Sequence, residues 1–292
     1  MLPGKTLILG GNGFLGHNFL RHISRDSVIH VTERLNFSVK QDTFLFRIQR
    51  DNLEVLIKLI KSSGFDYVIN CVANANIEVC ELEPEKAFFV NSEIPRLLAI
   101  ACKESKTQLI HISTDAVFDG FESMKSENSL AVPKTIYGKS KLSGEKSILK
   151  ENPSALIARV NFFGNSPKNN SIFDFFYNGL SRGIKLSGFT NIYFTPLYVE
   201  DTVRAIIYLI ENRKSGIFHV TGKERLSKFD FGQKIAKTWG YPVELISPSL
   251  YEGEADRPLD LSLDSTKLLN CGIDFPQLDV SLEKLRLKLE KK

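Results

Sequence analysis

An apolar segment runs directly into three regularly spaced glycines near the start of the chain. Residues 5–9 are mostly apolar, and Gly10, Gly13 and Gly16 follow with two residues between successive glycines. In a strand–turn–helix unit, the first two glycines permit a tight turn and close approach to a pyrophosphate, and the third lets the helix pack closely on the strand. The same residues could also form a strand–helix turn without a ligand. Because the preceding strand supplies the context that the motif requires, the pattern favours a dinucleotide-binding site.

A second apolar run, residues 28–31, is followed by Glu33 and Arg34. These two residues come roughly 20 residues after the glycines, where dinucleotide-binding folds place the group that contacts the adenosine ribose. A carboxylate at Glu33 would bind a free 2′-hydroxyl and favour NADH, whereas Arg34 would pair with a 2′-phosphate and favour NADPH. Both residues would also fit a solvated turn. The predicted cofactor is therefore NADPH or NADH, with the choice left open.

Strands and helices alternate through the first half of the chain. Short apolar runs predict strands at 5–9, 28–31, 67–71, 108–113 and 155–159, and the segments between them predict helices at 14–25, 51–63, 84–104 and 137–150. This alternation indicates an α/β fold with a Rossmann-type doubly wound parallel sheet. Beyond residue 160, further helices are predicted at 171–182, 199–212 and 227–239. We therefore expect an NAD(P)-binding Rossmann domain at 1–160 and a smaller C-terminal substrate-binding lobe at 161–292, packed as one unit with some elements interleaved.

Composition excludes several functional classes. The 292 residues carry a net charge of only +4. The sequence has no dense basic block of the kind that would indicate nucleic-acid binding. No run of about 18 apolar residues predicts a membrane span, and the N-terminus does not resemble a signal peptide. The four cysteines lack metal-binding spacing and read as reduced thiols, which predicts a cytoplasmic protein with no metal site.

The residues with the strongest chemical implication are Tyr137 and Lys141. They lie four positions apart, so they share one face of a helix. A phenol is a weak acid at neutral pH unless a nearby cation favours its ionised form, and Lys141 would supply that charge and also hold the nicotinamide ribose. Thr114 ends the fourth predicted strand, at the sheet edge where ligands bind, and could bond a carbonyl oxygen that Tyr137 protonates. A surface helix pair is the alternative interpretation of Tyr137 and Lys141 alone.

At this point the chain resembles the extended short-chain dehydrogenase/reductases, and more narrowly the dTDP-4-dehydrorhamnose reductase family. The most specific segment is Ser113-Thr-Asp-Ala-Val-Phe-Asp-Gly120. The other matching segments, which together span most of the chain, are 10–16, 66–71, 84–91, 137–145, 159–164, 194–201 and Arg257-Pro258.

The resemblance implies a role for particular residues. Thr114, Tyr137 and Lys141 would be the catalytic residues. The implied substrate contacts are Asn74, Thr114, Asp115, Asn161 and Arg257, with Arg257 binding a phosphate. The implied cofactor contacts are Gly10, Asn12, Gly13, Phe14, Leu15, Gly16, Glu33, Arg34, Cys71, Val72, Ala73, Asn91, Tyr137 and Lys141. The family often has Tyr where Asn74 stands, and an Asp-Gln pair where this chain has Thr190 and Asn191, so the sugar is left undefined.

The resemblance implies NAD(P)H-dependent reduction of a nucleotide-linked 4-keto-6-deoxysugar. A 4,6-dehydratase would have Glu where Ala116 stands, and the related epimerase-reductases would have Cys at position 115, which is Asp115. The alternatives that remain are a nucleotide-sugar epimerase and a non-catalytic regulatory subunit resembling methionine adenosyltransferase subunit beta. The expected partner is a nucleotide sugar, and a homodimer is possible. His111 and His219, both in apolar strands, are interpreted as core or supporting residues rather than catalysts.

Overall fold

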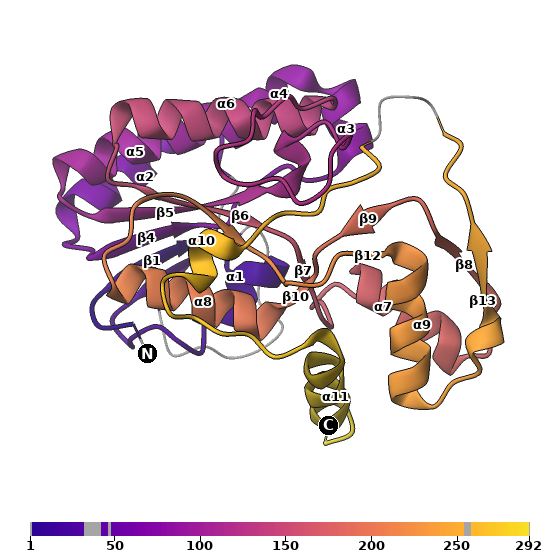
Figure 1. The fold of residues 1–292 in the computed structure, drawn as a ribbon. Helices are drawn as coiled ribbons and strands as arrows, with labels where there is room; N and C mark the ends of the chain where they lie inside the picture. Colours follow the sequence, from indigo (N-terminus) through magenta and orange to yellow (C-terminus); the bar gives the residue numbers. More distant parts are fainter. Residues whose placement is uncertain (1, 32–41, 46–47, 254–257, 292) are drawn as a thin grey trace.

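The computed structural model describes residues 2–31, 42–45, 48–253 and 258–291 (Figure 1). Within that part of the chain, seven parallel strands form the main sheet in the order β11-β6-β5-β4-β1-β2-β3. The strands are β1 (Thr6–Leu9), β2 (Val28–Val31), β3 (Asp42–Leu45), β4 (Tyr67–Asn70), β5 (Gln108–Thr114), β6 (Leu156–Val160) and β11 (Gly216–Val220). Because β1 pairs with both β2 and β4, the strand order reverses there, and the carboxyl ends on either side open a crevice.

Helices cover both faces of this sheet. One layer comprises α2 (Leu53–Ser62), α3 (Ile77–Leu82), α4 (Pro84–Phe88), the π-helical segment η1 (Phe89–Glu93), α5 (Ile94–Glu104) and α6 (Ile136–Glu151). The opposite layer comprises α1 (Phe14–Phe19), α8 (Val199–Glu211) and α10 (Thr266–Leu269) (Figure 1). Leu7 belongs to the core under α2 and α5, whereas Ile8 belongs to the core under α1 and α8. Burying each such side chain stabilises the fold by about 1.5–3 kcal/mol, which explains why these strands are apolar on both faces.

A smaller lobe lies beyond the carboxyl ends of the sheet (Figure 1). It contains α7 (Ile172–Ser181), α9 (Lys228–Trp239), and the strand pairs β9 (Tyr193–Phe194) with β12 (Leu226–Ser227) and β8 (Leu186–Phe189) with β13 (Ile246–Ser249). The remaining elements are β7 (Phe162–Phe163), β10 (Leu197–Tyr198), α11 (Leu278–Leu289), and the 3-10 turns η2 (Asp115–Val117) and η3 (Val243–Leu245).

Reciprocal side-chain caps fix the starts of the two lobe helices. Ser171 and Asp174 form a capping box at α7, and Ser227 and Asp230 form another at α9. Each box satisfies backbone N–H groups that have no partner within the helix. The α9 cap places Lys228 at the first position of its helix, beside the crevice.

The α/β architecture predicted from the sequence is confirmed, with four differences of detail. The edge strand β3 and the strand β11 were not predicted, and β11 together with α8 adds residues beyond 160 to the main sheet layer. The helix predicted at 84–104 contains the π-helical segment, and α1 ends at Phe19 instead of residue 25. The predicted ribose contacts Glu33 and Arg34 and the predicted phosphate contact Arg257 lie outside the described residues.

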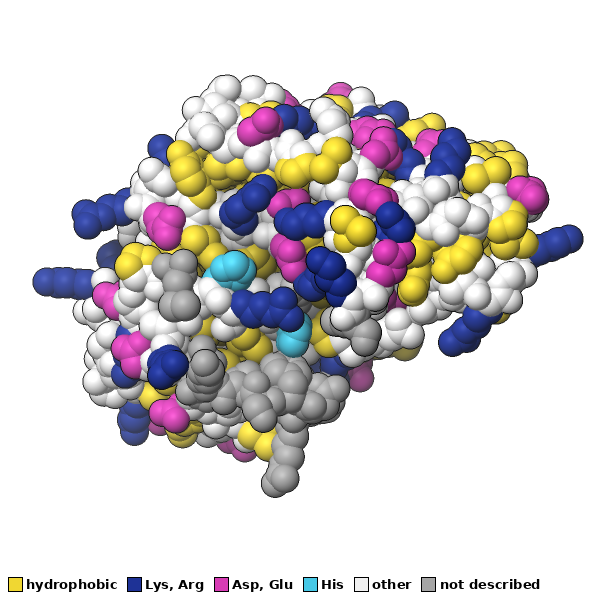
Figure 2. Space-filling view, turned by 90° about the horizontal axis from the view of Figure 1, so that it is seen from below, with side chains coloured by type: hydrophobic (Ala, Val, Ile, Leu, Met, Phe, Trp, Pro, Cys, Tyr) yellow, Lys and Arg dark blue, Asp and Glu magenta, His cyan; other side chains and the backbone are white. Residues whose placement is uncertain are grey.

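The surface agrees with the small net charge. Seen from below in Figure 2, basic and acidic side chains are interspersed among the described residues of that face. Within the described ranges, no helix combines the length and apolar character needed to cross a membrane.

Candidate active site

A cleft of about 480 Å³ lies between the sheet edge and the lobe. Its floor comes from segments that follow β1, β4, β5 and β6, which all end at the same edge. The lobe side contributes Ile192, Lys228 and Leu261. This is the position in which open α/β sheets bind ligands.

The glycine loop forms one wall of the cleft. Gly10 has a φ of +81°, a left-handed conformation that favours glycine, and its N–H donates to the His30 carbonyl oxygen at 3.1 Å. A Cβ on Gly16 would overlap the Gly10 carbonyl oxygen, so only glycine lets α1 pack this closely on the turn. A Cβ on Gly13 would meet only that same oxygen, at 3.2 Å, and would otherwise project into open space. The loop therefore has the room for a pyrophosphate that its sequence predicts.

Thr114, Tyr137 and Asp115 converge at the end of β5. The Tyr137 hydroxyl hydrogen bonds to Thr114, and the Thr114 hydroxyl donates to Asp115 at 3.0 Å while accepting from the Ala116 N–H at 3.2 Å. Burial raises the pKa of Tyr137 to about 12, against the lowering effect of the Thr114 hydrogen bond. Tyr137 is therefore protonated at neutral pH, as a proton donor must be.

Asp115 is the carboxylate of this group. The Asn161 amide donates to Asp115, and Lys228 lies close enough to lower the pKa of its carboxyl. Burial outweighs these effects and raises the Asp115 pKa to about 6. The ionised form of Asp115 is therefore disfavoured in the folded protein.

The raised pKa of Asp115 predicts a pH-dependent stability. The folded carboxyl binds its proton up to about pH 6, whereas the unfolded one releases it near 3.8, so this group stabilises the fold below pH 3.8 and the contribution is lost as pH rises through 6. Replacing Asp115 with Asn removes this dependence, which we expect to amount to less than about 3 kcal/mol. Urea unfolding of both proteins at several pH values measures it. If the free energy of unfolding varied with pH equally in the parent and in Asp115→Asn, the prediction would be contradicted.

Lys141 is one helical turn beyond Tyr137 but is directed to the sheet. Its amine contacts Nε2 of His111 at 3.1 Å and donates to the Ile112 carbonyl oxygen at 2.6 Å, and only 1% of the residue is exposed. Burial lowers the pKa of Lys141 to about 8, opposed by the Glu145 carboxylate and by Cys71. The expected lowering of the Tyr137 pKa by Lys141 is not seen, because Lys141 contacts His111 and Ile112 instead.

Asn91 lies beside the cleft and connects two segments that form its wall. It is fully buried in the π-helical segment, and its amide both accepts from the Asn74 N–H and donates to the Asn74 carbonyl oxygen, each at 2.9 Å. Its amide nitrogen also lies 3.0 Å from the Ser140 hydroxyl. Asn91 thus joins the loop after β4 to α6, and a π-helical turn is a common means of placing such a side chain.

A buried ion pair holds α6 against the sheet. The Arg159 guanidinium binds the Glu145 carboxylate through Nε and through NH2, with an NH2–Oε2 distance of 2.7 Å, and both side chains are at most 3% exposed. The Ser113 hydroxyl donates to the same carboxylate at 2.5 Å. His219 Nε2 lies 3.3 Å from Arg159 NH1, and burial lowers the pKa of His219 to about 3. Glu145 is one turn beyond Lys141, so this network fixes the helix that carries the site.

Most predicted site residues meet in the cleft. Those that line it are Gly13, Phe14, Leu15, Gly16, Cys71, Ala73, Thr114, Asp115, Tyr137, Lys141 and Asn161. Those placed beside it rather than on its wall are Gly10, Asn12, Val72, Asn74 and Asn91. The lining residues that sequence reasoning missed are Ala75, Ile77, Ile112, Ser113, Ala116, Thr135, Val160, Phe162, Ile192, Lys228, Pro258 and Leu261.

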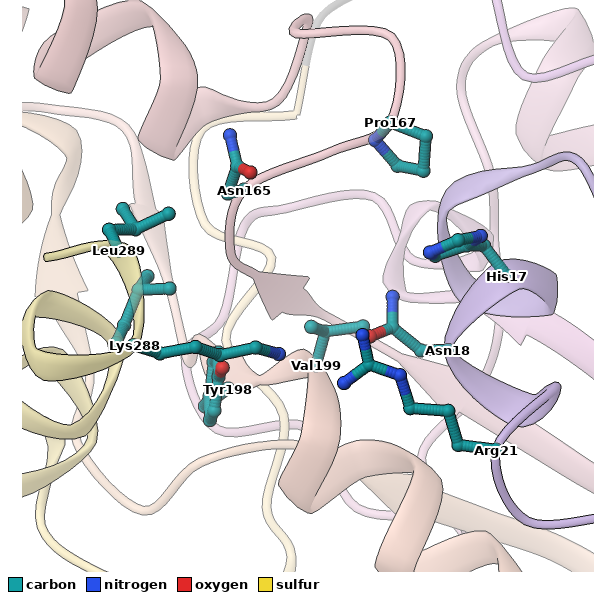
Figure 3. Close-up of a pocket in the computed structure, with 10 residues that line it drawn as sticks. His17, Asn18, Arg21, Asn165, Pro167, Tyr198, Val199, Lys288 and Leu289 are labelled. Carbon is teal, nitrogen blue, oxygen red and sulfur yellow. The ribbon is translucent and has the colours of Figure 1, made fainter. Parts of the chain in front are cut away.

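A second cavity, of about 210 Å³, lies between α1, the start of α8 and α11. Figure 3 shows Arg21 and Lys288 directed toward the same space, with Tyr198 beside Lys288. Lys288 is ion-paired with Glu200, to which the Tyr198 hydroxyl is also hydrogen bonded. Glu200 thus compensates the charge of Lys288, and we interpret this ion pair as part of the attachment of α11 to α8. Among the residues that the structure covers, no group of His, Cys, Asp and Glu could hold a metal ion.

The sequence of this chain is similar to known proteins over most of its length. The sequence profile of the RmlD substrate binding domain matches residues 4–288. The probable low-salt glycan biosynthesis reductase of Haloferax volcanii is 31% identical over 87% of this chain and 86% of its own length. Methionine adenosyltransferase 2 subunit beta of Xenopus tropicalis is 28% identical over 93% of this chain and 84% of its own length.

Solved structures share the fold. The crystal structure of a hypothetical dTDP-4-dehydrorhamnose reductase from Sulfolobus tokodaii has a TM-score of 0.82 at 31% identity, covering 95% of this chain and 98% of that one. The dTDP-4-dehydrorhamnose reductase of Bacillus anthracis, solved in complex with NADP, has a TM-score of 0.84 at 23% identity, covering 98% of this chain and 99% of that one.

Proposed function

The chain belongs to the RmlD substrate binding domain family, and we propose that it is an NAD(P)H-dependent reductase of a nucleotide-linked 4-keto-6-deoxysugar. The observation that carries this proposal is the meeting of Thr114, Tyr137 and Lys141 in one cleft beside the glycine loop. Tyr137 and Thr114 are hydrogen bonded to each other, as a pair that binds one carbonyl oxygen would be. NADP in the Bacillus anthracis relative supports the class of cofactor.

Each residue of the cleft has a separate proposed role in a carbonyl reduction. The bound cofactor would supply the hydride. Tyr137 is protonated and would donate its proton to the substrate oxygen, while Thr114 would orient that oxygen. Lys141 lines the cleft below Tyr137, where it would reach the ribose of the cofactor. Cys71 and Ala73 would line the cofactor on the β4 side.

The sugar nucleotide would lie toward the lobe. Asp115 and Asn161 are hydrogen bonded to each other on the cleft wall, where they would contact the sugar. Lys228 is a cation on the lobe side of the cleft, suited to a diphosphate. We retain Arg257 as a second proposed phosphate contact on the family motif alone. Glu33 and Arg34 remain proposed determinants of the choice between NADH and NADPH.

The direct test is cofactor oxidation with candidate sugars. Purified protein is incubated with NADPH or NADH and dTDP-4-dehydrorhamnose, and loss of the reduced cofactor is followed together with the sugar product. Reductase activity gives oxidation that depends on the sugar. Dinucleotide binding without oxidation of any 4-keto sugar, together with capture of a methionine adenosyltransferase catalytic subunit, would instead support the regulatory function of the Xenopus relative. Inversion of a sugar without net cofactor oxidation would support an epimerase.

Replacing Gly13 with Val is expected to abolish dinucleotide binding. The added side chain would project into the open side of the glycine loop, where the pyrophosphate is proposed to lie. Gly13→Ala adds only the Cβ and should weaken binding less. Calorimetric titration with NADPH measures both, and thermal unfolding of each variant checks that the fold is retained. Unchanged affinity in Gly13→Val would show that the cofactor does not use this loop.

A further inference from the structure

Three polar side chains form a line beneath the cleft, from β4 through β5 to α6. The Asn70 amide nitrogen lies 3.1 Å from Nδ1 of His111, and Nε2 of His111 lies 3.1 Å from the Lys141 amine. All three residues are at most 1% exposed. Because these side chains are almost fully shielded from water, each donor that faces another polar group is expected to meet an acceptor there.

The backbone fixes which end of the Asn70 amide faces His111. The Val72 N–H donates to Oδ1 of Asn70 at 3.1 Å, so the amide oxygen is turned toward Val72 and the NH2 group toward His111. Since an amide NH2 can only donate, Nδ1 of His111 must accept. Complete burial, the largest effect, lowers the pKa of His111 well below its usual value, so the ring is neutral and carries its one proton on Nε2.

This tautomer directs an N–H at Lys141. An ammonium group has three donors and no lone pair, so it cannot accept from Nε2–H, whereas a neutral amine can. The amine still donates to the Ile112 carbonyl oxygen at 2.6 Å. The Nε2–H donor of His111 therefore has an acceptor only if Lys141 is uncharged.

The other buried histidine shows the opposite arrangement. Nδ1 of His219 lies 3.1 Å from the Asp264 carbonyl oxygen, which can only accept, so Nδ1 carries the proton. Nε2 of His219 is then free to accept from the charged Arg159 guanidinium at 3.3 Å. In His219, a carbonyl oxygen at Nδ1 keeps the proton there and leaves Nε2 to accept from a cation. In His111, an amide NH2 group faces Nδ1 instead, so the proton lies on Nε2.

We propose that His111 is a positioning residue that, oriented by Asn70, holds Lys141 as a neutral amine in the cofactor-free protein near pH 8, and that Lys141 takes up a proton from solvent when the anionic dinucleotide binds. This inference rests on the proposed function, because it requires a dinucleotide in the cleft. The proton joins the nitrogen lone pair, which releases the bond from His111 and leaves the ammonium free to donate into the cleft that it lines.

The charged and titratable groups around Lys141 agree with the direction of this change. Burial lowers its pKa to about 8, while Glu145, further along α6, and Cys71, after β4, raise it. An N–H donor aimed at the nitrogen lowers the pKa further, because it bonds only to the neutral form. Elsewhere around the cleft, Asp115 and Cys80 each lie close enough to Tyr137 to raise its pKa, and the ring of His111 is neutral.

Two measurements test the proposal. Nitrogen NMR of the cofactor-free protein reports the tautomer of His111, and we expect the proton on Nε2. Calorimetric titration with NADPH in buffers of different ionisation enthalpy reports proton uptake, which we expect to approach one proton per dinucleotide at about pH 8 and to vanish at about pH 6, where Lys141 is already charged. A proton on Nδ1, or binding without uptake at the higher pH, would overturn the proposal. Absence of dinucleotide binding would overturn the proposed function instead. The tautomer of His111 would still test whether His111 holds Lys141 as a neutral amine.

A substitution at Asn70 is expected to reverse the direction of the hydrogen bonds that run through His111 to Lys141. Asn70→Asp can accept from both Val72 and His111, so we expect the proton of His111 to move to Nδ1, Lys141 to be charged before binding, and proton uptake to be lost. Asn152→Asp is the matched control, because Asn152 is buried at the far end of α6 and accepts from Ser154 through its oxygen; it should retain uptake. Unchanged uptake in Asn70→Asp would contradict the proposal. If that variant does not fold, the tautomer and the pH dependence of the unaltered protein decide.

Discussion

Replacing Tyr137 with Phe is expected to lower turnover of the 4-keto sugar by about 100-fold or more while dinucleotide affinity stays the same. The substitution removes only the hydroxyl that we propose as the proton donor. The aromatic ring still fills its place in the cleft, and Thr114 keeps its bonds to Asp115 and Ala116. Turnover is measured with saturating NADPH, and affinity is measured by calorimetry.

The matched control for this prediction is Tyr208→Phe. Tyr208 lies on α8 and donates its hydroxyl to the Cys271 carbonyl oxygen at 2.7 Å, away from the cleft, so the same loss of one hydroxyl should leave turnover unchanged. If Tyr137→Phe turned over as fast as the parent protein, Asp115 or a water molecule would have to supply the proton. The raised pKa of Asp115 makes it the first residue to examine in that event.

The sequence was most informative where one local pattern determines both structure and position. The apolar runs that form β1, β2, β4, β5 and β6 are buried on both faces, so their composition identifies them without tertiary information. The edge strand β3 has a mostly exposed pattern, and it pairs with β2 although its sequence carries no apolar run. The strand β11 begins at Gly216, far along the chain, and only its pairing with β6 reveals that it completes the sheet.

The site was predictable only in part, for a similar physical reason. Tyr137 and Lys141 share a helix face, and Thr114 ends a strand, so local geometry places them near the sheet edge. The partners of Lys141 depend on contacts between distant segments, since Asn70 and His111 are 41 residues apart in the chain and Lys141 is 30 residues beyond His111. Lys228 reaches the cleft because a capping box begins α9 beside it, and the sequence offers that box as the one local signal.

Replacing Glu145 with Gln is expected to destabilise the protein by about 3–5 kcal/mol, because it leaves the Arg159 guanidinium charged and buried without a counter-charge. Both side chains are at most 3% exposed, so water cannot replace the lost carboxylate at little cost. His219 cannot compensate, because it can offer Arg159 only the single lone pair of Nε2. Urea unfolding at neutral pH gives the free energy of unfolding for each protein.

Glu151→Gln on the same helix provides the control. Glu151 lies 3.5 Å from Arg96 with about a third of each side chain exposed, and such a surface pair contributes at most about 1 kcal/mol. The chemical change is identical in the two variants. The difference between their losses of unfolding free energy therefore measures the effect of burying the ion pair. Equal small losses would mean that the Arg159 charge is solvated in the folded state. In that case α6 would be held by its apolar contacts alone, and Glu145 would matter chiefly through its effect on the pKa of Lys141.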